Sequence, residues 1–211
     1  MDFKLSEEVS NEVKSADILV FEGFEMTGKS TLAEYIQNKY APSYLYRPDW
    51  EGILDTNIVA RGNRYIPGIS VVANWSDMKS LNLIQSDVKL LLDRWMAVSL
   101  VYQTMYNQSS DSKNPYLLAK SFIKSVGNLR LVFLHKSHSS EEEARLMYDI
   151  TMRNSKNHTD IYDKFDNFKD YYEKYLLFED CYDRFYNSNL NPFKVIKLSS
   201  LTNKITKSGG N

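Results

Sequence analysis

The sequence predicts a three-layer α/β fold, in which a five-stranded parallel sheet is flanked by helices and carries a short lid. Short runs rich in Val, Leu and Ile alternate with longer helical stretches, and this order is typical of parallel sheets with right-handed crossovers. The runs show no clean alternation of polar and apolar residues, which indicates strands covered on both faces. With 211 residues, 43% of them hydrophobic, the chain fits a single domain over 1–211 with a lid at about 153–161.

In chain order, five apolar runs are predicted to be strands. They are Asp17–Glu22, Ser43–Tyr46, Val88–Leu92, Leu129–His135 and Lys194–Leu198. Helices are expected between them and after them. They are Ser30–Tyr40, Val71–Ile84, Arg94–Tyr106, Pro115–Val126, about 141–153 and about 162–186.

Local signals support several of these helices. Asn114 followed by Pro115 is a plausible cap with proline at the first helical position. Ser140 followed by Glu143 matches a capping box. The last helix is rich in aromatic residues, which we interpret as core and lid packing, not as a platform for stacking bases. The polar tail Lys204–Asn211 is expected to fray.

Composition narrows the classes of partner. Lys and Arg total 26 and Asp and Glu total 27, so the near-neutral charge argues against a nucleic-acid polymer as partner. The single cysteine, Cys181, excludes an intramolecular disulfide and suits a reducing compartment. The N-terminus lacks a signal-peptide core and no apolar run approaches membrane-spanning length. We therefore expect a cytoplasmic protein with no membrane partner.

The sharpest motif is Gly23–Ser30, which matches G-x-x-x-x-G-K-[ST] between a predicted strand and a predicted helix. The two glycines let consecutive N–H groups point at phosphate oxygens, and the helix N-terminus adds its dipole. Lys29 is expected to reach the β- and γ-phosphates, and the Ser30 hydroxyl to coordinate Mg²⁺. The predicted cofactors are therefore ATP and Mg²⁺. The residues assigned to them are Gly23, Met26, Thr27, Gly28, Lys29, Ser30 and Thr31.

A second polar pair follows the third predicted strand. Asp93 and Arg94 come at the carboxyl end of that strand, where ligands bind in open α/β sheets. Asp93 is predicted to hold Mg²⁺ directly or through water, and Arg94 to clamp a phosphate. An Asp–Arg ion pair that caps the next helix would explain the two residues equally well. A GTPase is disfavoured because the chain has no Asn-Lys-x-Asp segment.

These segments resemble thymidylate kinases. The run Phe21–Thr31 is similar to the family's FEGxDGxGKST loop, and Asp93-Arg94-Trp95 followed by Val101-Tyr102-Gln103 is similar to its DRY…AYQ segment. The resemblance implies a P-loop kinase fold and phosphoryl transfer from ATP to a small nucleotide acceptor. It also implies a homodimer.

The resemblance implies substrate-binding roles for six residues. They are Glu25 near the sugar 3′-hydroxyl, Arg47 and Arg94 at the acceptor phosphate, Tyr102 under the deoxyribose, and Ser99 and Gln103 near the base. In relatives whose loop lacks a basic residue, the lid supplies one. Arg153, with Lys156, is the candidate here, and Lys29, Asp93 and Arg94 complete the predicted catalytic set. A solvated basic loop would explain Arg153 nearly as well.

The chain departs from the family at two places. Met26 and Thr27 stand where the family usually carries glycine and a small residue, and the helix before Asp93 lacks the arginine that helps to hold thymine. Trp75 or Lys79 is the candidate substitute for that arginine. The resemblance favours conversion of dTMP to dTDP as the activity, and the missing arginine leaves room for another pyrimidine. Other functions remain open. They are a kinase for a modified pyrimidine nucleotide or for a base within DNA, a deoxynucleoside kinase with Glu22, Glu25 or Asp93 as base, and a non-catalytic nucleotide switch.

Overall fold

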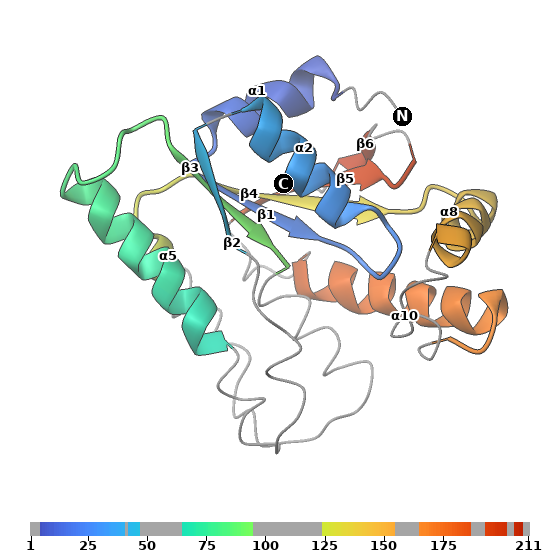
Figure 1. Cartoon of the computed structure of the whole chain (residues 1–211). Coiled ribbons are helices and arrows are strands. Elements are labelled where there is room, and N and C mark those ends of the chain that lie inside the picture. The colour runs from blue at the N-terminus through green and yellow to red at the C-terminus, as the bar shows by residue number, and fades with distance from the viewer. Residues whose placement is uncertain are drawn as a thin grey trace.

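The fold is known from a computed structural model that describes residues 5–40, 42–46, 65–94, 124–154, 165–186, 193–201 and 205–208. One twisted sheet runs through the molecule in the order β2-β3-β1-β4-β5-β6 (Figure 1). Its first five strands are parallel, and β6 is antiparallel to β5. The strands are β1 (Ile18–Glu22), β2 (Ser43–Tyr46), β3 (Lys89–Asp93), β4 (Leu131–Ser137), β5 (Lys194–Ser199) and β6 (Ile205–Ser208). The predicted α/β class and its five parallel strands are confirmed.

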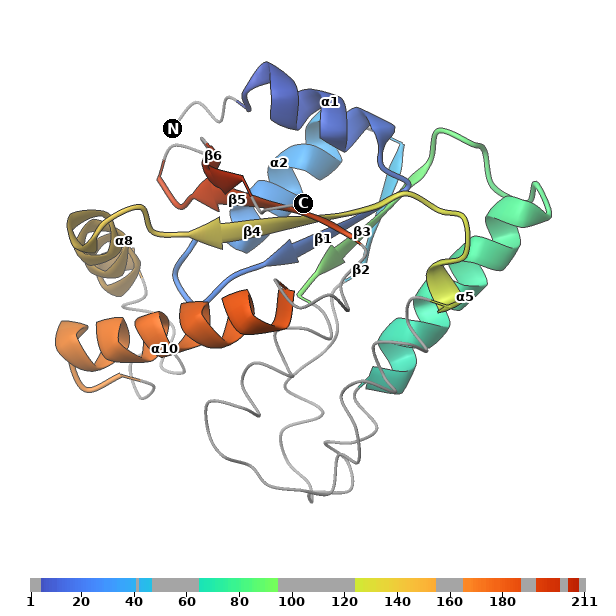
Figure 2. The ribbon, with the colours of Figure 1, turned by 180° about the vertical axis from the view of Figure 1, so that it is seen from behind.

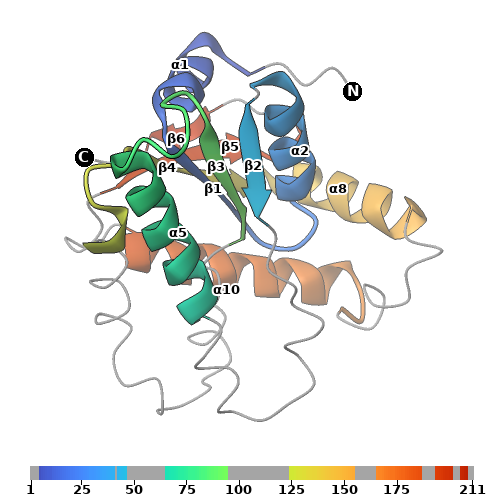
Figure 3. The same ribbon diagram turned by 60° about the vertical axis from the view of Figure 1, so that its left-hand side comes forward.

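Helices cover both faces of this sheet. One face carries α1 (Glu7–Ser15) and α2 (Lys29–Lys39), and the other carries α5 (Tyr65–Ser80) and α10 (Phe168–Tyr186) (Figures 1 and 2). The view in Figure 3 shows the three layers from the side. The remaining helix, α8 (Glu141–Asn154), packs against α10 through Tyr148, whose ring lies 5.3 Å from that of Tyr171.

The sheet separates two apolar clusters, one on each of its faces. Along β1, Ile18 and Val20 belong to the cluster under α5 and α10, whereas Leu19 and Phe21 belong to the cluster under α1 and α2. All five residues of β1 are buried. This explains why the strand reads as a continuous apolar run, since alternate side chains on a doubly covered strand face two different cores.

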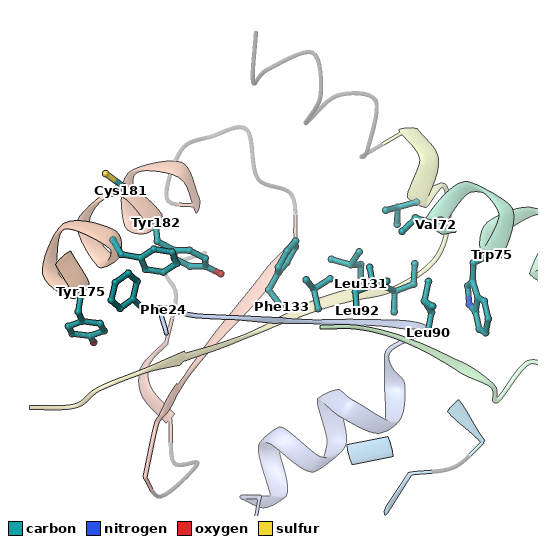
Figure 4. Close-up of a cluster of buried hydrophobic side chains, with 14 of the residues drawn as sticks. Phe24, Val72, Trp75, Leu90, Leu92, Leu131, Phe133, Tyr175, Cys181 and Tyr182 are labelled. Carbon is teal, nitrogen blue, oxygen red and sulfur yellow. The ribbon is translucent and has the colours of Figure 1, made fainter. Parts of the chain in front are cut away.

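Cys181 lies on α10 in the cluster under that helix (Figure 4). Its side chain is buried, and burial raises the pKa of the thiol. A thiol kept protonated is a poor nucleophile, so Cys181 serves as a packing residue of this cluster.

The structure corrects the predicted elements at several points. The tail is not wholly frayed, because Ile205–Ser208 forms β6 against β5. Helix α1 was not predicted, although Ser6 caps it by accepting a hydrogen bond from the Val9 amide at 3.3 Å. Helix α10 begins at Phe168 and not near 162, because Asn167 caps it by accepting from the Asp170 amide at 3.1 Å.

One carboxylate holds helix α1 to the amino ends of strands β4 and β5. Glu12 accepts hydrogen bonds from Arg130, just before β4, and from Lys194, at the start of β5, each at 2.7 Å. The residue therefore joins segments from the two ends of the chain.

Two predicted helices fall largely outside the described residues. Of Arg94–Tyr106 only Arg94 is described, and it is not helical, so the predicted start of that helix is wrong by at least one residue. Of Pro115–Val126 only 124–126 are described, and they are helical. Among the described helices, none is long and apolar enough to span a membrane.

Candidate active site

The loop from Gly23 to Gly28 joins β1 to α2 at the carboxyl edge of the sheet (Figure 1). Gly23 has φ 138°, and a Cβ there would lie 2.3 Å from the backbone oxygen of Lys136. Gly28 has φ 82° and precedes the first residue of α2. Both glycines are therefore required by backbone conformation, and Gly23 is also required by its close approach to β4. Strands β3 and β4 flank β1 on its two sides. Ligands of such parallel sheets bind at the carboxyl ends of the strands, where successive connections turn to opposite sides.

Side chains within the loop hold its shape. The Thr27 hydroxyl donates to the backbone oxygen of Phe24 at 2.9 Å, and Lys29 Nζ donates to the same oxygen at 3.0 Å. Lys29 is 4% exposed, so its ammonium lies inside the curve of the loop. A buried ammonium at that place can interact with phosphate oxygens that enter the loop.

Phe24 fixes the loop to α10. Its side chain is 1% exposed and its ring lies 5.6 Å from Tyr171, 5.3 Å from Phe178 and 6.2 Å from Tyr175. Figure 4 shows Phe24 beside Tyr175 and Tyr182 of this helix. The loop thus carries its own apolar anchor, and the prediction that the α10 aromatics are packing residues is confirmed for Phe178 and Tyr182, which belong to the core.

An ion pair joins the loop to the end of β3. Arg94 Nη2 lies 2.8 Å from Glu25 Oε2, and both side chains are partly buried. The Arg94 amide also donates to the Phe21 oxygen at 3.0 Å, which continues the pairing of β3 with β1. The structure therefore brings together the two motifs that lie almost seventy residues apart in the sequence.

Backbone strain is concentrated in this region. Among the described residues, three that are not glycine have positive φ: Met26 at 62°, Arg94 at 66° and Asn82 at 55°. Asn82 is in a turn, where asparagine tolerates this conformation, but Met26 and Arg94 are in the site. The family's usual glycine would adopt the Met26 conformation without that cost, which gives a physical meaning to the departure at this position. Strained residues of this kind cluster at functional sites.

The two predicted metal ligands come from adjacent elements. Asp93 follows Leu91 by two residues and so points to the same side of the sheet as α2, where Leu91 packs with Leu32. Ser30 is the second residue of α2. Asp93 is 5% exposed and Ser30 is partly buried. A hydroxyl and a carboxylate at the loop are the hard oxygen ligands that Mg²⁺ prefers, so the donor set fits that ion.

The other predicted residues are placed as follows. Thr31 is exposed in the first turn of α2, and Arg153 is exposed in the last turn of α8. Arg47, Ser99, Tyr102, Gln103 and the lid beyond Asn154 lie outside the described residues.

Neither candidate substitute for the missing arginine lies at this edge of the sheet. Lys79 Nζ donates to the Gln85 oxygen at 3.2 Å and lies 3.8 Å from Asp17, and both partners precede the amino ends of strands. The ring of Trp75 stacks 6.3 Å from that of Tyr44 on β2, and its cluster includes Leu90 at the start of β3 (Figure 4). The suggestion that either residue replaces the arginine is therefore wrong.

A set of buried polar residues behind the loop was missed by sequence reasoning. Tyr171 donates from its hydroxyl to the Glu25 backbone oxygen at 2.9 Å, and His138 lies 2.7 Å from that hydroxyl. Glu143, the capping-box residue of α8, turns one carboxylate oxygen back to the Ser139 amide at 3.1 Å, and the other accepts from the Leu201 amide at 2.7 Å. The capping signal predicted the first contact to within one residue, but no local pattern marks the others.

Comparison with known proteins identifies solved structures of similar fold. One is a deoxyadenosine kinase from M. mycoides with the products dCMP and a flexible dCDP bound, at a TM-score of 0.49 and 15% identity over 87% of this chain and 90% of that chain. Another is the thymidylate kinase from Candida albicans, at 0.47 and 16% over 88% of this chain and 84% of that chain. The deoxyadenosine kinase with bound dCTP gives 0.48 and 13% over 87% and 90%. No protein-family model and no curated protein matches the chain.

Proposed function

We propose that this chain is a kinase that passes the terminal phosphate of ATP to a deoxynucleoside monophosphate, with dTMP, giving dTDP, as the favoured acceptor. The observation that carries the proposal is the contact between Glu25 and Arg94 at 2.8 Å. It puts an arginine that suits an acceptor phosphate beside a loop that suits the donor phosphates. The choice of dTMP rests on the resemblance of the two motifs to thymidylate kinases.

The donor side uses charge and backbone geometry. The amides of Gly23–Ser30, together with the N-terminus of α2, surround the triphosphate with partial positive charge. Lys29 supplies a full positive charge close to the phosphates. Bound Mg²⁺ would neutralise charge on the β- and γ-phosphate oxygens, with Ser30 and Asp93 as the residues that hold it.

The acceptor side needs positioning more than it needs a base. A phosphate oxygen of a nucleoside monophosphate is already anionic at neutral pH, so no proton has to be removed before attack. Arg94 binds that phosphate through its planar fork, and Glu25 holds the fork in place on its other side. Arg47 is proposed to bind the same phosphate, and Ser99, Tyr102 and Gln103 to bind the nucleoside.

A deoxynucleoside kinase is the second candidate, and one observation favours it. Glu25 is a carboxylate of the loop, held beside the end of β3 by its ion pair with Arg94. A sugar hydroxyl must lose its proton as it attacks, and a carboxylate at that place can accept it. Because neither Lys79 nor Trp75 lies at the carboxyl edge of the sheet, a modified pyrimidine nucleotide is a further acceptor to test.

The deciding experiment measures ADP release from Mg·ATP in a coupled assay with nucleosides and nucleoside monophosphates. A strong response to dTMP supports the favoured reaction, and a response to thymidine alone supports the second candidate. The Lys29→Met variant serves as control, since it keeps the length of the buried side chain and removes its charge. Turnover at the wild-type rate in Lys29→Met would mean that the activity does not come from this loop. Absence of turnover with every acceptor would overturn the proposal.

The resemblance also supports a homodimer as part of this proposal, and the single cysteine, Cys181, supports a cytoplasmic location. Light scattering of the purified chain measures the mass in solution. A mass of twice 24.6 kDa agrees with the dimer, and a monomer mass contradicts it.

A further inference from the structure

A line of hydrogen bonds between buried side chains runs from α8 to the loop. Ser200 Oγ donates to Glu143 Oε1, and His138 Nδ1 lies 2.6 Å from Ser200 Oγ. On the other side of the imidazole, Nε2 lies 2.7 Å from the Tyr171 hydroxyl, which is 2.9 Å from the Glu25 backbone oxygen. The line thus ends on the residue whose side chain holds Arg94.

All the side chains in this line are shielded from solvent. Tyr171 is 0% exposed, Ser200 6%, Glu143 8% and His138 9%. They come from α10, from the turn after β5, from α8 and from the segment after β4. Because buried polar groups without partners are costly, four separate segments are fixed relative to the loop by these contacts.

The line holds fewer protons than it has contacts when His138 is neutral. There are four contacts, and each needs one hydrogen. Tyr171, Ser200 and a neutral imidazole bring only one hydrogen each. One contact must then lack its hydrogen, whereas an imidazolium would supply all four.

The surroundings of His138 favour the neutral form. Burial lowers the pKa of His138 to about 4, and Lys136 on β4 acts in the same direction, while Glu143 on α8 and Glu179 on α10 oppose them. The imidazole also faces the rings of Tyr171 and Tyr175. At neutral pH the position of its single proton therefore decides which contact is incomplete.

The other hydrogen bonds that Glu143 accepts decide which imidazole nitrogen carries that proton. If the proton is on Nε2, the imidazole donates to Tyr171, Tyr171 donates to Glu25, and the Ser200 hydroxyl shares its one hydrogen between Nδ1 and Glu143. Glu143 can share that donor, because it also accepts from the Ser139 amide and hydroxyl, the Ser199 hydroxyl and the Leu201 amide. If the proton is on Nδ1, Tyr171 donates to the imidazole and its hydrogen bond to the Glu25 oxygen is lost.

We propose that Tyr171 and His138 are positioning residues for the acceptor side of the site, with His138 in the Nε2-protonated form directing the Tyr171 hydroxyl to the Glu25 oxygen. The inference rests on the proposed function for its kinetic consequence. Fixing the backbone of Glu25 fixes its carboxylate, and the carboxylate fixes Arg94. Neither Tyr171 nor His138 touches the substrates in this arrangement.

The test compares Tyr171→Phe with Tyr175→Phe. Both tyrosines are buried on α10, and the Tyr175 hydroxyl also bonds to His138, through its backbone amide at 2.9 Å and its carbonyl oxygen at 3.2 Å. The Tyr171 hydroxyl, in contrast, donates to the Glu25 backbone oxygen. Tyr171→Phe is expected to lower kcat/KM for the acceptor by about fivefold to tenfold with the KM for ATP nearly unchanged, since one hydrogen bond is lost. Tyr175→Phe is expected to leave both close to the wild type.

A second pair of variants separates positioning from folding. In His138→Gln the amide nitrogen reaches the place of Nε2 and can donate to Tyr171, so acceptor kinetics are retained. In His138→Asn the amide reaches only the place of Nδ1, and the kinetic loss of Tyr171→Phe is reproduced. Equal kinetics in His138→Gln and His138→Asn would overturn the inference even if both variants are less stable.

Amide hydrogen exchange over residues 23–28 provides a measurement that needs no acceptor. Tyr171→Phe should speed exchange there by about fivefold to tenfold relative to Tyr175→Phe. If the wild type turns over no acceptor, the proposed function fails and exchange alone decides the inference. Equal exchange and equal kinetics in the two tyrosine variants would refute the positioning role while leaving the proposed function intact.

Discussion

Gly23 is the residue of the phosphate loop with the least room for change. Its φ of 138° disfavours any side chain, and a Cβ would lie 2.3 Å from the backbone oxygen of Lys136. Gly23→Ala is therefore expected to lower the free energy of unfolding by more than the roughly 1–3 kcal/mol that a strained φ alone costs. Urea denaturation measures the loss.

Gly28→Ala is the matched control for that substitution. Its φ of 82° is also unfavourable, but the nearest atom to its Cβ would be the Ser200 oxygen at 3.7 Å, an ordinary contact. It should cost only the conformational strain. A variant pair with equal losses would mean that the contact with β4 does not constrain Gly23.

Glu143 makes the stability of the fold depend on acid. Burial raises the pKa of its carboxyl, but hydrogen bonds from Ser139, Ser200, Ser199 and the Leu201 amide outweigh burial and lower the pKa to about 2. The ionised carboxylate therefore stabilises the fold fully above pH 4.5, and this stabilisation is lost as the pH falls towards about 2.

We expect Glu143→Gln to be less stable than the wild type at pH 7 by up to about 3 kcal/mol, and to lose less stability between pH 5 and pH 2. Thermal unfolding across that pH range measures both effects. Glu141→Gln removes the same charge from the first turn of α8, where the side chain is exposed, and should keep the acid dependence of the wild type. An unchanged pH profile in Glu143→Gln would contradict the assignment.

Arg153 tests the proposed lid. It lies exposed in the last turn of α8, at the first residue of the segment predicted to be the lid. If its guanidinium stabilises charge that develops during phosphoryl transfer, Arg153→Ala should lower kcat by about tenfold or more while changing ATP binding little. Lys169→Ala, which removes a side chain 85% exposed on α10, controls for a general loss of surface charge. Unchanged kcat in Arg153→Ala would remove Arg153 from the catalytic set.

Residues in the site differ in how far the sequence alone could predict them. Lys29 and Ser30 belong to a contiguous motif whose spacing is fixed by the chemistry of phosphate binding, so the sequence alone predicts a role for both. His138 and Tyr171 meet across thirty-three residues, with no periodic or motif signal to link them. Their partnership depends on how α10 crosses the sheet, which single-residue patterns do not encode.

At the scale of the secondary-structure elements, the start of α10 is set by one cap. Asn167 accepts from the Asp170 amide through Oδ1 at 3.1 Å, and its backbone oxygen accepts from the Tyr171 amide at 3.0 Å. Asn167→Ala should therefore cost about 1 kcal/mol of stability, while Asn167→Ser should retain most of it. Denaturant unfolding of the two variants gives the comparison, and equal stabilities would show that the cap is dispensable.

Buried parallel strands were the elements easiest to predict, and the edge elements were the hardest. Strands β1 and β4 are buried on both faces, which requires a run of apolar residues in each. Such a run is visible in the sequence, so the two strands can be located from it. Strand β6 reads Ile-Thr-Lys-Ser and forms only because β5 offers an unpaired edge. Helix α1 has only two buried residues, Val9 and Val13, which is a weak periodic signal.

At the scale of the whole molecule, binding of nucleotide should stabilise the fold. The loop that would hold the phosphates is packed against β4 through Gly23 and against α10 through Phe24, so ligand bound there favours the assembled state. Mg·ATP at one hundred times its Kd should add about 2.7 kcal/mol, seen as a rise in Tm. Lys29→Met should show a much smaller rise. An equal rise in both proteins would place the nucleotide elsewhere.

The contact between Glu12 and Lys194, 182 residues apart, has a consequence for how the chain acquires its fold during synthesis. The central strand β1 pairs with β3 and β4, and the Glu25 backbone oxygen accepts a hydrogen bond from Tyr171, 146 residues further along the chain. Contacts of such long range make folding slow, because loop closure must precede any gain from packing. A nascent chain that ends before α10 therefore contains the phosphate-binding loop without the α10 residues that hold the loop in place. We expect the site to form only after nearly the whole chain has been synthesised.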